Sequence, residues 1–168
     1  MAYSKQTWSD TPGQTPINAT RLNHMEDGIA DNEVDYIIKT ASTSAPDSIR
    51  STGSDYTIDL DRSVSVGNSL TLSQSGIKIG SGINRVRFSA MVSFDSVTTG
   101  KKVLKVYKNT TLIGCATSYV NENGSVSLPQ RIVTVSENDI IYLKINGTSG
   151  DSISALEPYT FLTVEKIN

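Results

Sequence analysis

The most constraining feature of this sequence is an alternation of apolar and polar residues that recurs in short segments after residue 55. The clearest case covers residues 86–94, where the apolar positions are Val86, Phe88, Ala90, Val92 and Phe94. Because successive side chains of a β-strand point to opposite faces, a period of two predicts a strand with one buried and one exposed face. A helix cannot produce this pattern over so many residues.

Further strand-like segments follow one another to the C-terminus. They lie at residues 64–66, 70–72, 103–107, 112–116, 126–128, 132–135, 140–145 and 159–167, separated by residues typical of turns. Eight or more short strands with no helical pattern between them predict an antiparallel β-sandwich, and their number favours a jelly roll. The expected fold class is therefore mainly β.

Two of these segments, residues 140–145 and 161–164, are apolar at consecutive positions. A strand that is buried on one face only should alternate, so both segments predict a contact on the second face as well. Either a central position in a deep core or a second copy of the chain can supply that contact.

A short helix is predicted between Thr15 and Lys39. Its apolar stripe has spacings of three and four residues and consists of Leu22, Met25, Ile29, Asn32 and Tyr36. This is the a/d pattern of a coiled coil, in which one polar residue commonly sets the register. Because so short a helix with a central glycine is marginal in water, we expect the stripe to pack against the same helix in other copies.

Composition divides the chain into three parts. Residues 1–39 form an N-terminal arm and the stalk helix, residues 40–54 are rich in Ser, Thr, Ala, Pro and Gly, and residues 55–168 form the β-sandwich head. The middle part is predicted to be a linker. Trp8, the only tryptophan, lies in the arm. It can pack on the chain's own helix or anchor the arm in a larger assembly, since tryptophan is favoured at interface hot spots.

Charge and hydropathy narrow the classes of partner. The chain has 15 Lys and Arg residues and 17 Asp and Glu residues, and its longest basic block is Lys101-Lys102. We therefore expect no nucleic-acid partner. No segment approaches the roughly 18 apolar residues of a membrane span, and the N-terminal residues lack the apolar core of a secretory signal. Membrane insertion is not expected, and neither is a signal peptide.

The sequence shows no convincing catalytic, metal or cofactor site. His24, the only histidine, is expected in the helix, where it is a poor candidate for the base of a hydrolase triad. Asp59 and Asp61 could serve as paired carboxylates, but they lack the aromatic neighbours of a sugar cleft. Cys115 is the only cysteine and is expected to be a buried structural thiol. We expect no enzyme activity, no metal and no cofactor.

The best local candidate for ligand binding is the polar loop between two predicted strands at residues 119–124. It supplies Tyr119, Asn121, Glu122 and Asn123. An aromatic ring beside amide and carboxylate groups suits stacking on a sugar and hydrogen bonding to it. The same residues suit an ordinary turn, which is the commoner role of such a loop.

Two parts of the sequence resemble known proteins. Residues 8–29, with Thr15-Pro-Ile, Leu22-Asn and Glu26-Asp-Gly-Ile, resemble the start of tail-fibre and baseplate proteins of phages and prophages of Gram-positive bacteria. Residues 76–80, 86–90, 137–143 and 159–165 resemble the C-terminal β-module of such proteins. That module is similar to the trimeric jelly rolls of tumour necrosis factor and complement type. Asn138 stands where the resemblance leads us to expect glycine, and asparagine tolerates the left-handed backbone that such a turn requires.

The resemblance implies a homotrimer located on the tail of a virion. Residues 1–39 would attach to other tail or baseplate proteins, with Trp8 as the candidate anchor, and the head would face the host. The stalk helix would set the register while the head supplies most of the trimer contact. The expected function is recognition of a bacterial cell-surface polymer, of saccharide type, without catalysis. The alternative is a structural connector that binds another particle protein, and a polysaccharide depolymerase comes third.

Overall fold

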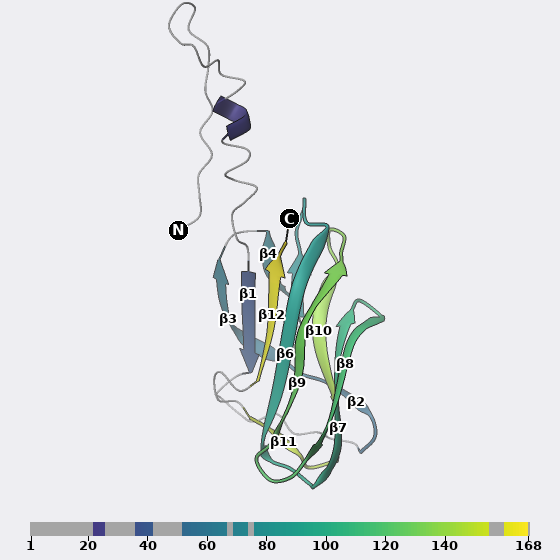
Figure 1. Cartoon of the computed structure of the whole chain (residues 1–168). Helices are drawn as coiled ribbons and strands as arrows, with labels where there is room; N and C mark the ends of the chain where they lie inside the picture. Colours follow the sequence, from purple (N-terminus) through teal and green to yellow (C-terminus); the bar gives the residue numbers. More distant parts are fainter. Residues whose placement is uncertain are drawn as a thin grey trace, which may run out of the picture.

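The structure is a computed structural model of the chain, and it describes residues 22–25, 36–41, 52–66, 69–73, 76–154 and 160–167. Two antiparallel sheets face each other and form a β-sandwich (Figure 1). Residues 22–25 form a short helical turn. The predicted fold class, mainly β with a sandwich of jelly-roll type, is confirmed. Among the described residues, no helix has the length and apolar character needed to cross a membrane.

The first sheet, called the β6 sheet, is centred on the longest strand. Its strands are β1 (Tyr36–Ala41), β3 (Leu60–Val66), β6 (Arg85–Ser96), β9 (Ser125–Thr134), β11 (Ser152–Ile153) and β12 (Phe161–Lys166). Strand β6 pairs with β9, β11 and β12, and the sheet continues from β12 through β1 to β3.

The second sheet, called the β10 sheet, contains β2 (Asp55–Thr57), β4 (Leu70–Ser73), β5 (Gly76–Ile79), β7 (Gly100–Lys108), β8 (Thr111–Val120) and β10 (Ile140–Asn146). Its order is β4-β5-β10-β7-β8, with β2 also paired to β10. The β2, β5 and β11 strands have two to four residues each. Such short strands give little periodicity, so the sequence pattern did not reveal them.

The core between the two sheets consists of the inward-facing apolar residues of both. The predicted alternation in β6 is confirmed, because its five apolar positions are buried and the residues between them are partly exposed. Strands β10 and β12 also alternate in burial although their sequences do not alternate in polarity. Their outward residues, such as Tyr142 and Phe161, are only partly buried within one chain.

Strand β9 is continuous through Pro129, where the sequence suggested two separate strands. Phe88 pairs with Arg131 and Ala90 pairs with Leu128, so the pair 129–130 lies opposite the single residue 89. This is a β-bulge, one of the few places where a strand accepts a residue without a backbone N–H. The proline therefore bends the strand without ending it.

The helix prediction is wrong at residues 36–39, which belong to β1. This strand pairs with β12 on one edge and with β3 on the other. Its sequence, Tyr-Ile-Ile-Lys-Thr-Ala, carries aromatic and β-branched residues that favour strands. Pairing on both edges outweighs the local helical period, so Tyr36 lies in the sandwich and not on a helical stripe.

The strand register shows which features share an end of the sandwich. Tyr36 pairs with Glu165, which also pairs with Arg87, so β1 begins at the end where β6 begins and β12 ends. The connections at residues 97–99, 121–124 and 147–151 lie at the opposite end, called the distal end (Figure 1). The chain therefore enters the sandwich through β1 at the end away from these three loops.

Candidate functional site

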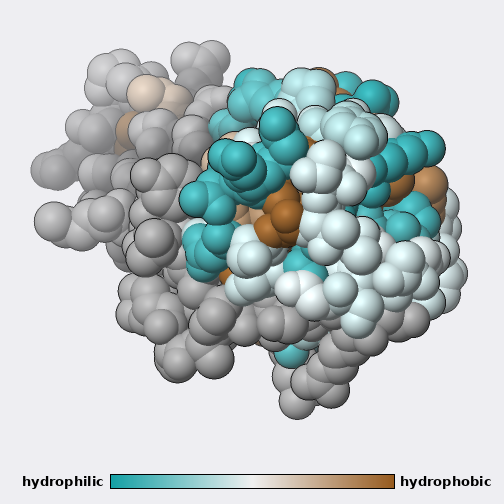
Figure 2. Space-filling view, turned by 90° about the horizontal axis from the view of Figure 1, so that it is seen from below, coloured by the Kyte–Doolittle hydropathy of each residue, from teal (hydrophilic) through white to brown (hydrophobic). Residues whose placement is uncertain are grey.

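The distal end is the best-defined candidate site, because three loops from both sheets meet there. Figure 2 views the molecule from this end and shows mainly hydrophilic and neutral surface with small, separate hydrophobic spots. A surface of this kind does not resemble the large apolar patch of an obligate protein interface. It suits a polar ligand.

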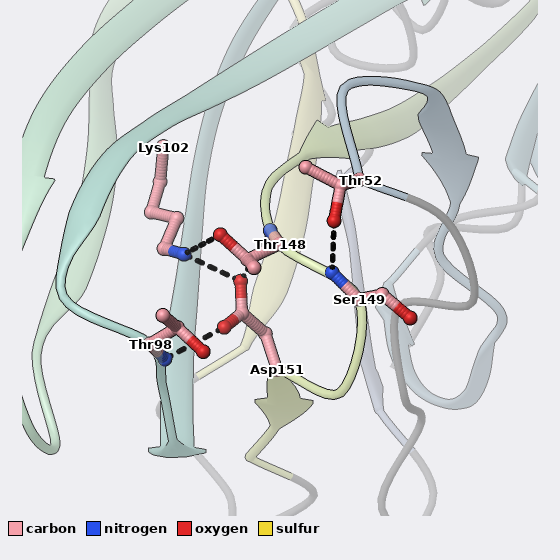
Figure 3. A network of polar contacts seen from close by, with 6 residues as sticks. All are labelled: Thr52, Thr98, Lys102, Thr148, Ser149 and Asp151. Atoms are coloured by element: carbon pink, nitrogen blue, oxygen red, sulfur yellow. Dashed lines mark hydrogen bonds and ion pairs between the residues drawn. The ribbon is translucent and has the colours of Figure 1, made fainter.

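A buried ion pair supports the distal end from within. The side chains of Lys102 and Asp151 are both fully buried, and Lys102 Nζ lies 2.5 Å from Asp151 Oδ2 (Figure 3). Lys102 Nζ also donates a hydrogen bond to Thr148 Oγ1 at 3.1 Å. Charges buried to this degree are tolerated only when they are paired and their hydrogen bonds are satisfied.

Asp151 joins two of the distal loops. Its carboxylate accepts hydrogen bonds from the backbone N–H of Thr98 at 2.8 Å and of Thr148 at 2.7 Å. The backbone N–H of Ser149 donates to Thr52 Oγ1 at 2.9 Å, which adds the segment before β2 (Figure 3). The loops at 97–99 and 147–151 are thus held in fixed relative positions.

The sequence contained an unused signal for this network. In β7 the buried positions are Lys102, Leu104 and Val106, so Lys102 lies in the apolar phase of the strand. A lysine in that phase requires a carboxylate partner, since its ammonium group loses water. The partner, Asp151, is 49 residues further along the chain and could not be identified by spacing.

The structure places the four ligand candidates at the distal end. Tyr119, at the end of β8, is 74% exposed, and Asn121, Glu122 and Asn123 are exposed in the loop that follows. Their exposure is consistent with ligand contact and with an ordinary turn. Glu122 has a φ of 48°, in the left-handed region that disfavours residues other than glycine, asparagine and aspartate.

Asn138 also has a left-handed backbone, with a φ of 70°. The expectation that asparagine would adopt this conformation in place of glycine is confirmed. The neighbouring Asp139 closes the turn by accepting a hydrogen bond from the Ser136 N–H at 2.9 Å. Burial acts to raise the pKa of Asp139, but this bond and one from Asn109 outweigh it, so the pKa lies below its usual value.

Cys115 does not match its prediction. It lies in β8 as expected but is exposed, because it occupies the outward phase of the strand. The buried phase is occupied by Gly114, where an added Cβ would lie only 2.6 Å from Leu128 Cδ2. The small glycine thus lets the β6-sheet side chains approach β8, and the larger cysteine faces outward.

The remaining candidates are spread over the chain. Trp8, Ile29 and Asn32 lie outside the described residues. Leu22 is partly buried, while His24 is exposed and Met25 is 61% exposed, so their role in a stripe between copies stays a prediction. Asp59 is exposed. Within the described ranges, no group of three His, Cys, Asp or Glu residues could hold a metal ion.

Comparison with known proteins adds evidence on the fold. No family model matches the chain, and no curated protein does. A crystal structure of murine APRIL at pH 8.0 is similar, with a TM-score of 0.63, 14% identity, and coverage of 80% of this chain and 100% of that chain. The PRD1 vertex protein P5 has a TM-score of 0.60 and 19% identity, covering 80% and 97%. Eiger TNF from S. frugiperda has a TM-score of 0.56 and 10% identity, covering 80% and 93%.

These similarities establish the fold as a jelly roll like that of tumour necrosis factor. The identities of 10% to 19% show the fold alone. The fold by itself does not give a function, which depends on the surface chemistry of the two sheets.

Proposed function

We propose that this chain is a homotrimeric tail protein of a phage, whose head recognises a host cell-surface saccharide without catalysis. The observation that carries the proposal is the opposite placement of chain entry and exposed loops. The N-terminal part joins the head at one end, and the polar distal end with Tyr119 lies at the other. A protein attached to a particle through its N-terminal part would present the distal end to the host.

The fold supports a virion location. The PRD1 vertex protein P5 has a similar jelly roll, as do the APRIL and Eiger structures. The resemblance of residues 8–29 to tail-fibre and baseplate proteins points to the tail. Attachment through residues 1–39 and Trp8, and contact with other tail or baseplate proteins, form part of the proposal.

The outward face of the β6 sheet suits packing between copies of the chain. Its paired positions include Met91 opposite Phe161 and Ser89 opposite Thr163, all partly exposed. The Arg87 guanidinium pairs with Glu165 at 3.0 Å across β6 and β12. The exposed Arg85 and Asp95 at the two ends of β6 balance in charge, and the outward positions between them are small, apolar or ion-paired, so that covering the centre of this face costs little desolvation.

Arg87 supplies a second argument for this face. Among the described residues, its Nε is the one covered side-chain nitrogen or oxygen without a hydrogen-bond partner. A covered donor without a partner is costly, and a neighbouring copy could provide the acceptor. We therefore assign the trimer contact to the outward side of β6, β9 and β12.

Light scattering of the full chain tests the assembly. We expect a particle with three times the mass of the 18.1-kDa chain at micromolar concentration. A monomer under these conditions would contradict the trimer. Sedimentation of the protein with purified wall polysaccharide from candidate host cells tests recognition, and bovine serum albumin serves as the control protein. If no fraction binds the trimer, the recognition proposal fails while the assembly stands.

The second candidate is a structural connector, whose head binds another particle protein. The likeness to a protein described as a vertex protein favours it, because a vertex is a structural part of a particle. A pull-down from purified virions in which the full chain retains one tail component, together with no polysaccharide binding, would support the connector.

A further inference from the structure

We propose that the outward face of the β10 sheet binds an anionic polysaccharide. We call it the lysine face, because its outward-facing positions carry Lys78, Lys101, Lys105 and Lys144. The corresponding positions of the described strands in this sheet carry one carboxylate, Asp55, and the exposed Asp59 follows β2. The whole chain has a net charge of −2, so positive charge is concentrated on this face.

Two of the lysines lie directly opposite each other. Lys105 in β7 pairs with Lys144 in β10, and like charges at opposing positions destabilise a sheet. Asp55 offsets this repulsion in part, since Lys105 Nζ lies 2.7 Å and 2.9 Å from its two oxygens. The pairing therefore places two ammonium groups side by side on the outward face, with only Lys105 offset by a carboxylate.

The contact between Lys105 and Asp55 favours the charged form of both side chains. The hydrogen bond to Asp55 raises the pKa of Lys105 above its usual value. Burial acts to raise the pKa of Asp55, but the hydrogen bonds from Lys105 and Asn146 outweigh it and lower that pKa. Lys144 has no carboxylate partner among the described ion pairs and is free to meet an anion.

Stacked tyrosines lie beside these lysines. The rings of Tyr107 and Tyr142 have centroids 5.6 Å apart and planes 16° apart. Lys144 Nζ lies over both rings, 5.3 Å from the centroid of Tyr107 and 5.9 Å from that of Tyr142. Gly76 is the partner of Tyr142 in β5, so no β5 side chain lies directly opposite this tyrosine.

The shape and chemistry of the lysine face suit a chain with charge and hydroxyl groups. Lys101 and Lys105 are four residues apart in one strand, roughly 13 Å. Lys101 pairs with Tyr119, so the face continues to the distal end. Lysines supply attraction to acidic groups, and tyrosines supply flat surfaces and hydroxyls for sugar rings. The occupant that matches both features is an anionic polysaccharide.

This inference deepens the proposed function and rests on it, since it assigns a charge to the polymer and a second surface to its recognition. The native Cys115 provides the probe, because it is exposed and pairs with Lys105 on the same face. The experiment measures the rate at which a maleimide alkylates Cys115 in the full chain. Dextran sulfate is the anionic polysaccharide, and neutral dextran of the same length is the control polymer.

We expect dextran sulfate to slow alkylation and neutral dextran to leave it unchanged. The double variant K78Q/K144Q should need about tenfold more dextran sulfate for the same protection, because attraction to a polyanion falls with each lysine lost. K166Q removes one lysine charge from β12 of the other sheet and should behave as the wild type.

Three results would overturn the inference. The first is that dextran sulfate does not protect Cys115. The second is that K166Q loses as much protection as K78Q/K144Q. The third is that inorganic polyphosphate protects as well as dextran sulfate at the same charge concentration, which would indicate charge attraction alone. Failure of the proposed function gives a different result. In that case dextran sulfate still protects Cys115 of the full chain, but no wall polysaccharide sediments with it.

Discussion

The outward faces of the two sheets differ in charge, although both sheets contribute the same apolar kind of residue to the core. The face of β6 and β12 has Met91, Phe161 and small hydroxyl residues, and its charges balance: Arg87 pairs with Glu165, and the exposed Arg85 and Asp95 at the two ends of β6 are opposite in sign. The face of β5, β7 and β10 has four lysines and two stacked tyrosines. Both sheets need apolar side chains on their inward faces, so the difference in charge between the outward faces reflects what each outward face contacts.

The difference has an energetic basis. Covering a lysine removes water from its ammonium group and costs several kcal/mol unless a partner is supplied. Covering serine, threonine, methionine and phenylalanine costs little or is favourable. The β6 sheet is therefore the side that copies of the chain can bury, and the β10 sheet is the side that stays open to an anionic ligand.

The largest expected effect comes from a charge on the packing face. Met91→Glu should abolish the trimer, because each copy would bury an unpaired carboxylate at a cost of several kcal/mol. Leu112→Glu is the matched control, since Leu112 is 47% exposed on the lysine face and should leave the trimer intact. Light scattering of both variants at equal concentration tests the assignment. A trimer in the first variant and a monomer in the second would mean that the two faces are exchanged.

The next effect compares two consecutive lysines of β7, one inward and one outward. Lys102→Met should lower the free energy of unfolding by about 3–5 kcal/mol, because Asp151 is left buried without its cation. Lys101→Met should change it by no more than about 0.5 kcal/mol, as for most exposed positions. Urea unfolding of both variants measures the difference. Equal effects would show that the Lys102–Asp151 pair does not support the distal end.

A smaller effect on stability is expected in the loop at residues 121–124, which connects β8 to β9. Glu122→Gly should raise the free energy of unfolding by about 1 kcal/mol, because glycine adopts a positive φ without strain. Asn123→Gly is the control, since Asn123 is not among the residues with positive φ and should gain nothing. Thermal unfolding provides the comparison, and a gain in the control variant alone would contradict the strain.

The smallest expected effect is on the loss of stability at acidic pH. Because the pKa of Asp55 is lower in the folded state than its usual value, its contribution to stability is complete above the usual pKa. It disappears as the pH falls through the lower, folded-state pKa. Asp55→Asn should therefore lose less stability than the wild type between pH 5 and pH 2, by under about 1 kcal/mol, because solvent still reaches this partly buried pair and screens it. Urea unfolding across this range is the measurement, and parallel curves would contradict it.

The same variant sharpens the difference between the faces. Asp55→Asn removes the one carboxylate at the outward positions of the described β10-sheet strands and releases Lys105. At neutral pH it should therefore bind dextran sulfate more tightly than the wild type, in the Cys115 protection measurement. Weaker binding would indicate that Asp55 holds Lys105 in the geometry the ligand needs.

The sequence predicted the sandwich because strand periodicity is a local property. The alternation of β6 follows from its own residues and needs no knowledge of its neighbours. Strand β1 was missed because its stability comes from pairing with β12 and β3, which lie far away in sequence. The phase of Lys102 indicated burial, yet only the fold reveals Asp151 as its partner.

The lysine face was beyond the reach of the sequence for a related reason. Alternation tells which residues share a face of one strand, but not which strands are neighbours. Tyr107 and Tyr142 meet only because β7 pairs with β10 in one register. The candidates at 119–124 were found because they lie within one loop, whereas the cluster around Lys144 draws on β2, β7 and β10.

The position of β1 also decides how the head responds to mechanical load. In the proposed tail protein, tension acts between the N-terminal part at one end of the sandwich and the ligand surfaces that reach the other, along the strand axis. Strand β1 pairs with β12 over five residue pairs and with β3 over six. A pull along β1 therefore shears both edges at once and meets many hydrogen bonds together, where a sideways pull would open them one by one. The head should therefore resist unfolding when it is pulled along β1.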